Sequence, residues 1–207
     1  MLFSHRHQAF TLLEVLVVIA IMSIVAISAF SSIINLQKTA RVNETHQRFT
    51  NFLNLARSYA LDGKLVSGVA SGCDTGSCLP KYFGARIDQN SPDGSCDNQS
   101  SRAVIFYAPI TLLSYEKSKT VTLDSFCINS RVTPLIETAG LGTISDVAFL
   151  YEPPLGAFST SKNVGSASEI AISFCDLPQS STNASSGCSQ SSYKKTITLY
   201  ANAGIPE

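Results

Sequence analysis

An apolar run near the N-terminus constrains this chain more than any other feature. Residues 15–34 contain only Ala, Val, Ile, Leu, Met, Phe and Ser, and a single acidic residue, Glu14, stands immediately before them. A helix of about 20 apolar residues is long enough to cross the hydrocarbon core of a bilayer, which is about 30 Å thick. We therefore expect residues 15–34 to form a membrane-spanning helix.

The residues around this run predict its orientation and its processing. The short tail before it carries Arg6, and the positive-inside rule keeps such a tail in the cytoplasm and exports the rest of the chain. A secretory leader has its cleavage site after the apolar stretch. Here the small residue Ala9 precedes the stretch, and residues 28–30 offer an alternative site. A carboxylate inside a membrane costs about 2–3 kcal/mol and usually marks function, so we expect Glu14 to have a partner.

Residues 8–20, QAFTLLEVLVVIA, resemble the signature of the type IV pilin and pseudopilin superfamily. That signature is a small residue, usually Gly, followed by Phe-Thr-Leu-Leu-Glu and a long apolar helix; Ala9 stands at the Gly position. The resemblance implies that a prepilin peptidase cuts between Ala9 and Phe10 and methylates the new amine of Phe10. It also implies that this ammonium neutralises Glu14 of a neighbouring subunit within a filament. The alternative is an ordinary signal anchor in which Glu14 is incidental.

The helix is expected to continue beyond the membrane. No Gly or Pro occurs between Phe10 and Asp62, which predicts a single helix of roughly 80 Å. From Phe49 onward the apolar residues recur every three or four positions, so this half should pack against a head domain. Gly63 is the expected C-cap. Major type IV pilins commonly carry a Pro in this helix, and its absence here favours a minor subunit.

The composition changes after Gly63 to Ser, Gly, Asn and Thr with short β-favouring runs. Strands are expected at residues 81–88, 102–107, 120–128, 146–151, 169–175 and 194–200. Period-two alternation should turn both Val121 and Leu123 toward the core. We therefore expect an α+β fold: a long N-terminal α-helix, membrane-spanning in its first half, packed on a head made of a single antiparallel β-sheet or sandwich, as in type IV pilins.

The same segments define the expected domains and location. Residues 1–9 form the leader peptide, 10–34 the transmembrane and filament-core helix, 35–63 its amphipathic continuation, and 64–207 an extracytoplasmic β-rich head. The protein should cross the inner membrane once, with its N-terminus cytoplasmic and its head periplasmic. It should then enter a pilus or pseudopilus at the cell surface.

A second resemblance concerns the two ends of the head. Residues 53–60, LNLARSYA, with Val66, and residues 195–199 leading to Gly204 are similar to the GspH/FimT branch of minor pilins and pseudopilins. It implies a subunit near the tip of a type IV pilus that primes or supports assembly for twitching, adhesion or DNA uptake. The alternatives are a GspH-like minor pseudopilin of a type II secretion system and a tip adhesin or DNA-binding module. The expected partners are prepilin peptidase, other major and minor pilins or pseudopilins, and the inner membrane.

Six cysteines all lie in the predicted exported part, where an even number favours disulfides. Six cysteines allow 15 pairings. Local spacing favours Cys73 with Cys78 and Cys175 with Cys188. Cys96 and Cys127 are then left as the third pair.

The remaining composition excludes several functions. No C-x-x-C occurs, and the histidines are His5, His7 and His46, none in the head, so we expect no metal, no cofactor and no catalytic residue. Lys+Arg and Asp+Glu are equal at 15 each, which gives no electrostatic footprint for nucleic acid. The protein is therefore not expected to be an enzyme or to have a small-molecule substrate. Residues 88–97 are rich in oxygen donors, and a solvated turn is favoured there over a calcium site.

Overall fold

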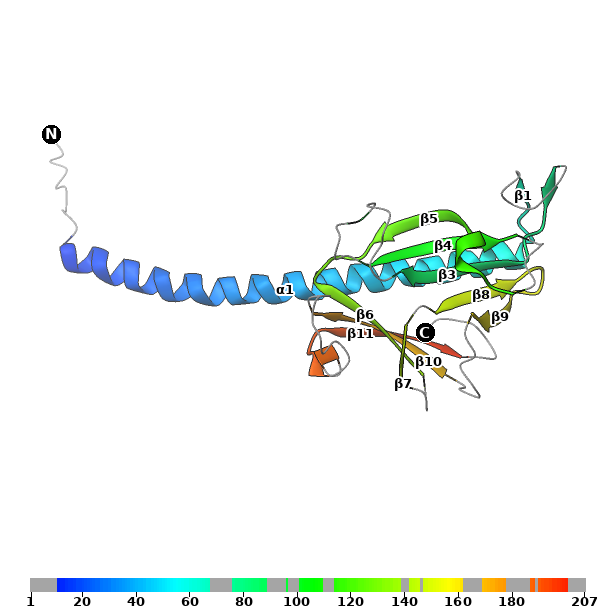
Figure 1. Ribbon diagram of the computed structural model, residues 1–207. Helices are drawn as coiled ribbons and strands as arrows, with labels where there is room; N and C mark the ends of the chain where they lie inside the picture. The colour runs from blue at the N-terminus through cyan, green and yellow to red at the C-terminus, as the bar shows by residue number, and fades with distance from the viewer. Residues whose placement is uncertain are drawn as a thin grey trace, which may run out of the picture. The chain divides into compact units, whose positions relative to one another are not determined.

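The computed structural model describes residues 11–67, 76–88, 96, 101–109, 114–138, 142–145, 147–161, 169–177, 187, 188 and 190–200. The chain forms two compact units, Met1–Lys38 and Thr39–Glu207. Helix α1 (Leu12–Leu61) begins in the first unit and ends in the second (Figure 1).

The C-terminal end of α1 is closed by a glycine cap. Gly63 has a φ of 60°, and its N–H donates to the carbonyl of Ala60 with N and O 3.2 Å apart. The N–H of Lys64 donates to the carbonyl of Tyr59 at 3.0 Å. These two bonds form the Schellman pattern, which favours Gly because the residue takes left-handed backbone. The predicted cap at Gly63 is confirmed.

The second unit consists of the C-terminal part of α1 and three antiparallel sheets. The largest sheet has the order β5-β4-β3-β8-β9, with β3 (Tyr82–Asp88), β4 (Arg102–Ala108), β5 (Val121–Cys127), β8 (Ala148–Glu152) and β9 (Ala157–Thr160). The next has the order β11-β10-β6-β7, with β6 (Val132–Thr138), β7 (Gly142–Ile144), β10 (Glu169–Asp176) and β11 (Lys194–Tyr200). A two-stranded ribbon pairs β1 (Val66–Ser67) with β2 (Ser77–Cys78), and the short 3-10 helix η2 (Lys117–Lys119) precedes β5. The α+β prediction of a long helix packed on antiparallel sheets is confirmed.

The core of the head forms where one face of α1 meets both larger sheets. In Figure 1, β5 of the large sheet is seen above α1, and β8 and β9 of the same sheet are seen below it with β6, β10 and β11 of the other. Phe49 is fully buried at the centre of this face. Its ring meets Phe149 of β8 with centroids 6.3 Å apart and Phe174 of β10 with centroids 5.8 Å apart, both edge-on. The buried positions of α1 recur every three or four residues: Val42, Thr45, Phe49, Leu53, Ala56 and Ala60. The predicted apolar stripe therefore joins α1 to two sheets.

The six predicted strands correspond to β3, β4, β5, β8, β10 and β11, with ends shifted by at most two residues. Strand β6 is not among them and contains Pro134, which has no backbone N–H. It pairs with β10 over its whole length but with β7 only at Ile136, Glu137 and Thr138. Pro134 thus lies where one side of β6 has no paired strand among the described residues, and a missing donor is tolerated at such a position.

The period-two expectation for β5 is wrong at Leu123, which is 38% exposed. Asp124 and Thr122 pair with successive residues of β4, so Leu123 between them is the extra residue of a β-bulge. The bulge breaks the alternation: Val121 packs against the core as expected, and Phe126 takes the next apolar inward position.

The face of the large sheet that points away from α1 holds a buried ion cluster. The Asp88 carboxylate, 5% exposed, lies 3.0 Å from Nε of Arg86, 2.7 Å from Nζ of Lys117 and 3.8 Å from Nη2 of Arg102. Three cations around one carboxylate fix η2 on the sheet and identify Asp88 as a structural counter-ion. Asp88, the first carboxylate of the stretch considered as a calcium site, residues 88–97, is therefore already paired with three cations. Of the rest of that stretch, only residue 96 is among the described residues.

Candidate assembly site

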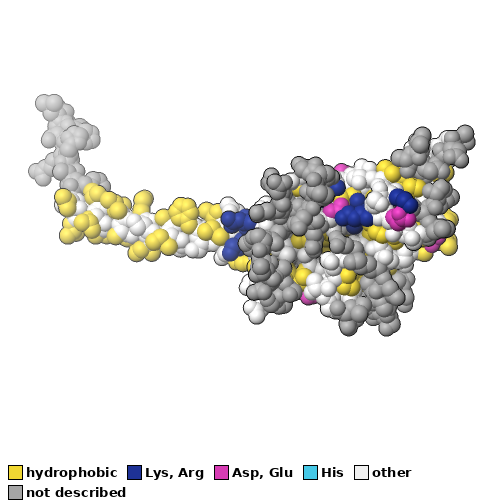
Figure 2. All heavy atoms as spheres, in the orientation of Figure 1, with side chains coloured by type: hydrophobic (Ala, Val, Ile, Leu, Met, Phe, Trp, Pro, Cys, Tyr) yellow, Lys and Arg dark blue, Asp and Glu magenta, His cyan; other side chains and the backbone are white. Residues whose placement is uncertain are grey.

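The N-terminal part of α1 presents an apolar surface. Its large side chains are exposed, among them Leu12 at 84%, Ile27 at 69% and Phe30 at 66%. Figure 2 shows hydrophobic side chains along this part of the helix on the face in view. The helix is long and apolar enough to cross a membrane. Burial of such a surface in lipid or against other helices is strongly favourable because it removes apolar area from water.

Several serine side chains of this surface bond to the backbone of the helix itself. Ser23 Oγ donates to the carbonyl of Ile19 at 2.8 Å, and Ser28 Oγ donates to that of Val25 at 2.9 Å. Serine hydroxyls that bond back to the preceding turn require no partner from outside. These serines therefore need no new partner when the helix exchanges lipid for neighbouring apolar helices.

Glu14 is the only charged residue between residues 11 and 37. Its N–H lies 3.3 Å from Oγ1 of Thr11, which therefore acts as the N-cap of α1. A carboxylate in the first turn interacts favourably with the helix dipole, but a single charge on an apolar surface still needs a cation once water is removed. The predicted junction residues Ala9 and Phe10, which would supply that cation, lie outside the described residues.

Two disulfides lie among the described residues of the head. The pairs are Cys96–Cys127 and Cys175–Cys188, with Cα atoms 5.6 and 5.5 Å apart. These distances suit disulfides, and the pairs are two of the three expected from the sequence. Cys78 is also disulfide-bonded, and its expected partner Cys73 lies outside the described residues. Within the described part of the chain, no group of three His, Cys, Asp or Glu side chains could hold a metal ion.

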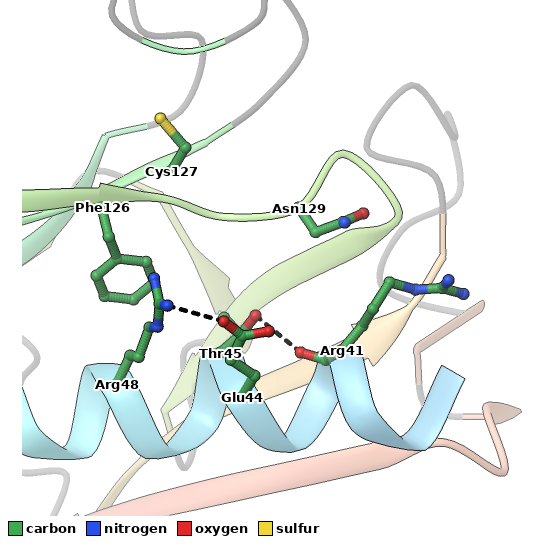
Figure 3. A pocket seen from close by; sticks show the side chains of 7 residues that line it. All are labelled: Arg41, Glu44, Thr45, Arg48, Phe126, Cys127 and Asn129. Atoms are coloured by element: carbon green, nitrogen blue, oxygen red, sulfur yellow. Dashed lines mark hydrogen bonds and ion pairs between the residues drawn. The ribbon is translucent and has the colours of Figure 1, made fainter. Parts of the chain in front are cut away.

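A polar pocket of about 170 Å³ lies between α1 and the end of β5 (Figure 3). Its lining residues are Arg41, Glu44, Thr45, Arg48, Phe126, Cys127 and Asn129. Arg48 Nη2 lies 2.9 Å from Oε1 of Glu44, and its guanidinium stands over the Phe126 ring at 5.7 Å from the centroid. Arg41 points away from this pair in Figure 3, and its Nη2 meets Oδ1 of Asp176 at 3.0 Å.

Phe126 also borders a second pocket, of about 330 Å³, further along α1. Its lining includes Asn51, Phe52 and Asp124, and the Phe52 ring meets Phe126 edge-on at 5.2 Å. The charged side chains of the first pocket are paired with one another or with Asp176. The sequence did not reveal these pockets because the bulge at Leu123 decides which side of β5 faces α1.

The family model for the prokaryotic N-terminal methylation motif matches residues 4–30. This motif is the prepilin-type signal of type IV pilins and pseudopilins, whose members are structural subunits. Comparisons with curated proteins and with solved structures gave no match. The chain thus carries a signal that implies processing by prepilin peptidase and assembly with other pilins, and residues 12–30 of this signal lie in the exposed apolar part of α1.

Proposed function

We propose that this chain is a minor pilin-like structural subunit at or near the tip of a type IV pilus, where it primes or supports filament assembly. The observation that carries the proposal is the methylation motif at residues 4–30, most of which lies on the exposed apolar part of α1, where Glu14 is the only charge. A filament subunit needs such a surface twice, first in lipid and then against its neighbours.

In this proposal prepilin peptidase removes residues 1–9 by cutting between Ala9 and Phe10, and the new amine of Phe10 is methylated. The resulting ammonium pairs with Glu14 of a neighbouring subunit. Breaking a buried ion pair by removing one partner costs about 3–5 kcal/mol, because the other charge is left uncompensated. The pair therefore sets the register of subunits, while apolar burial supplies most of the free energy of assembly.

The proposed domains follow from these roles. Residues 10–34 are the membrane and filament-core helix, residues 35–63 the continuation that carries the head, and residues 64–207 the periplasmic head. Disulfides at Cys96–Cys127 and Cys175–Cys188 suit an oxidising compartment. This supports the proposal that the head is exported before it is assembled.

Two observations favour a minor subunit. Helix α1 contains no Pro, unlike the helix of many major pilins, and residues 53–60 and 195–199 are similar to the GspH/FimT branch. The same branch includes pseudopilins, so a GspH-like subunit of a type II secretion system is the second candidate. Deletion separates the two: loss of surface pili or twitching supports the first, and retained pili with lost exoprotein release supports the second.

The first test is the intact mass of the protein extracted from its native membrane without reducing agent. We expect a chain that begins at N-methyl-Phe10 and is lighter by six hydrogens than the reduced form, since each of three disulfides from six cysteines removes two. A chain that retains Met1 in cells with active prepilin peptidase would contradict the processing and leave a membrane-anchored β domain.

A further inference from the structure

The part of the head nearest the membrane can be located from chain distance alone. The continuous exposed apolar stretch at the start of α1 ends at Leu36, and the second compact unit begins at Thr39. Three residues span at most about 11 Å even when fully extended, and about 4.5 Å in a helix. The headgroup layer of a bilayer is roughly 5–8 Å thick on each side. Whatever the orientation of the head, Thr39 and its immediate neighbours therefore lie at the level of the headgroups or just outside them.

The start of strand β11 lies beside these residues. A shallow pocket of about 80 Å³ is lined by Thr39, Val42, Asn43, Ser192, Tyr193, Lys194 and Lys195. Lys195 is exposed, and Tyr193 and Lys194 are half-buried. Tyrosine and lysine are the side chains that anchor membrane proteins at the interface, because each combines an apolar body with a polar tip. We call residues 193–195 with Thr39 and Asn43 the basal corner.

The charges around the basal corner leave it basic. Among the described residues, the ion pairs at this end of the head join Arg41 to Asp176 and Arg48 to Glu44, and none involves Lys194 or Lys195. His46, one turn further along α1, has a pKa lowered mainly by burial and also by the charge of Lys195. The positive charge of Lys195 thus disfavours protonation of His46, and an anion bound beside Lys195 would be attracted by the same charge.

We propose that the basal corner binds the phosphate headgroups of anionic phospholipids on the extracytoplasmic face of the inner membrane. Lys194 and Lys195 supply the charge, and the Asn43 amide supplies an uncharged donor beside them. The inference rests on the proposed function, because it requires residues 15–34 to span the membrane with the head exported. Lipid contact at this corner would hold the head close to the bilayer until the subunit leaves the membrane for the filament.

The test uses the full chain reconstituted in nanodiscs that hold equal amounts of phosphatidylglycerol and phosphatidylcholine. Native mass spectrometry of the released protein counts the lipids of each kind that it retains. A basic residue at an anionic surface is worth about a fivefold preference, so Lys194→Gln with Lys195→Gln should lower the ratio of phosphatidylglycerol to phosphatidylcholine by about fivefold if one lysine contacts the lipid and by about 25-fold if both do. Lys194→Arg with Lys195→Arg keeps both charges and should keep the ratio.

A matched control removes the same charge elsewhere on the head. Lys64→Gln with Lys119→Gln changes two exposed lysines, one after the C-terminal end of α1 and one in η2, and should leave the ratio unchanged. An equal ratio in the wild type and in the Lys194/Lys195 variant, or an equal fall in the control, would overturn the inference and leave the proposed function intact. A chain that does not insert across the nanodisc would overturn both.

Discussion

Replacing Phe49 with Ala should weaken the attachment of α1 to the head more than any other single truncation in the helix. Phe49 is fully buried and is the residue whose ring contacts Phe149 of one sheet and Phe174 of the other. Phe→Ala at a core position costs about 3–5 kcal/mol, from lost transfer free energy and from the cavity left behind. Because two edge-on ring contacts, each worth about 0.5–1.5 kcal/mol, are lost together, we expect the upper part of that range.

The assay is urea unfolding of the full chain in detergent micelles, followed by near-ultraviolet circular dichroism of the tyrosines. Phe49→Ala should lower the free energy of unfolding by about 4–5 kcal/mol, with a fall in melting temperature of about 8–20 °C. Leu155→Ala, at a residue that is 82% exposed, is the control and should change the free energy by less than about 0.5 kcal/mol. A loss below about 2 kcal/mol for Phe49→Ala would refute the view that this ring joins the helix to both sheets.

Four further changes test the processing signal, the assembly charge, one half-buried histidine and one disulfide. Ala9→Leu should leave a full-length precursor that inserts but is not assembled, and a mature-length product on a gel would disprove the assigned junction. Glu14→Val should permit cleavage yet reduce incorporation into filaments by at least about tenfold, since an unpaired ammonium would remain in an apolar core; unaltered incorporation in sheared-filament fractions would show that the charge pair is unimportant. Burial lowers the pKa of His46 from its ordinary value of 6.5, so the unfolded chain binds more protons and stability should fall as pH drops below about 6.5, a dependence that His46→Gln should reduce when urea midpoints at pH 7.5 and 5.5 are compared. Replacing Cys175 and Cys188 together with Ala opens a loop of sequence separation 13 and should cost about 3 kcal/mol in the same urea assay, whereas an unchanged midpoint would mean that buried packing alone holds this loop.

The sequence predicts local features of this fold better than pairings between distant segments. The bounds of α1 and its cap follow from the run without Gly or Pro and from Gly63, because helix formation depends on neighbouring residues. Strand β6 could not be recognised in the same way. Pro134 argues against a central strand, and only the pairing pattern shows that one side of β6 is open at that residue.

The same reason explains what the sequence revealed of the candidate site. Glu14 and the apolar surface belong to one continuous stretch of the sequence, so they could be predicted without knowledge of the tertiary structure. The pockets beside Phe126 depend on the bulge at Leu123, and the buried cluster at Asp88 depends on η2 returning to the sheet. The basal corner likewise needs β11 to lie against the helix more than 150 positions earlier in the chain, which follows from tertiary packing alone.

The N-cap at Thr11 has a consequence for the order of events during maturation. The groups that close the first turn of α1 are the Thr11 hydroxyl and carbonyl, and both follow the proposed cleavage point between Ala9 and Phe10. Proteolysis therefore deletes none of the atoms that terminate the helix. The cap of the helix therefore does not depend on cleavage, and a cut at the proposed point would add only a charge one residue before Thr11 without changing the fold of α1.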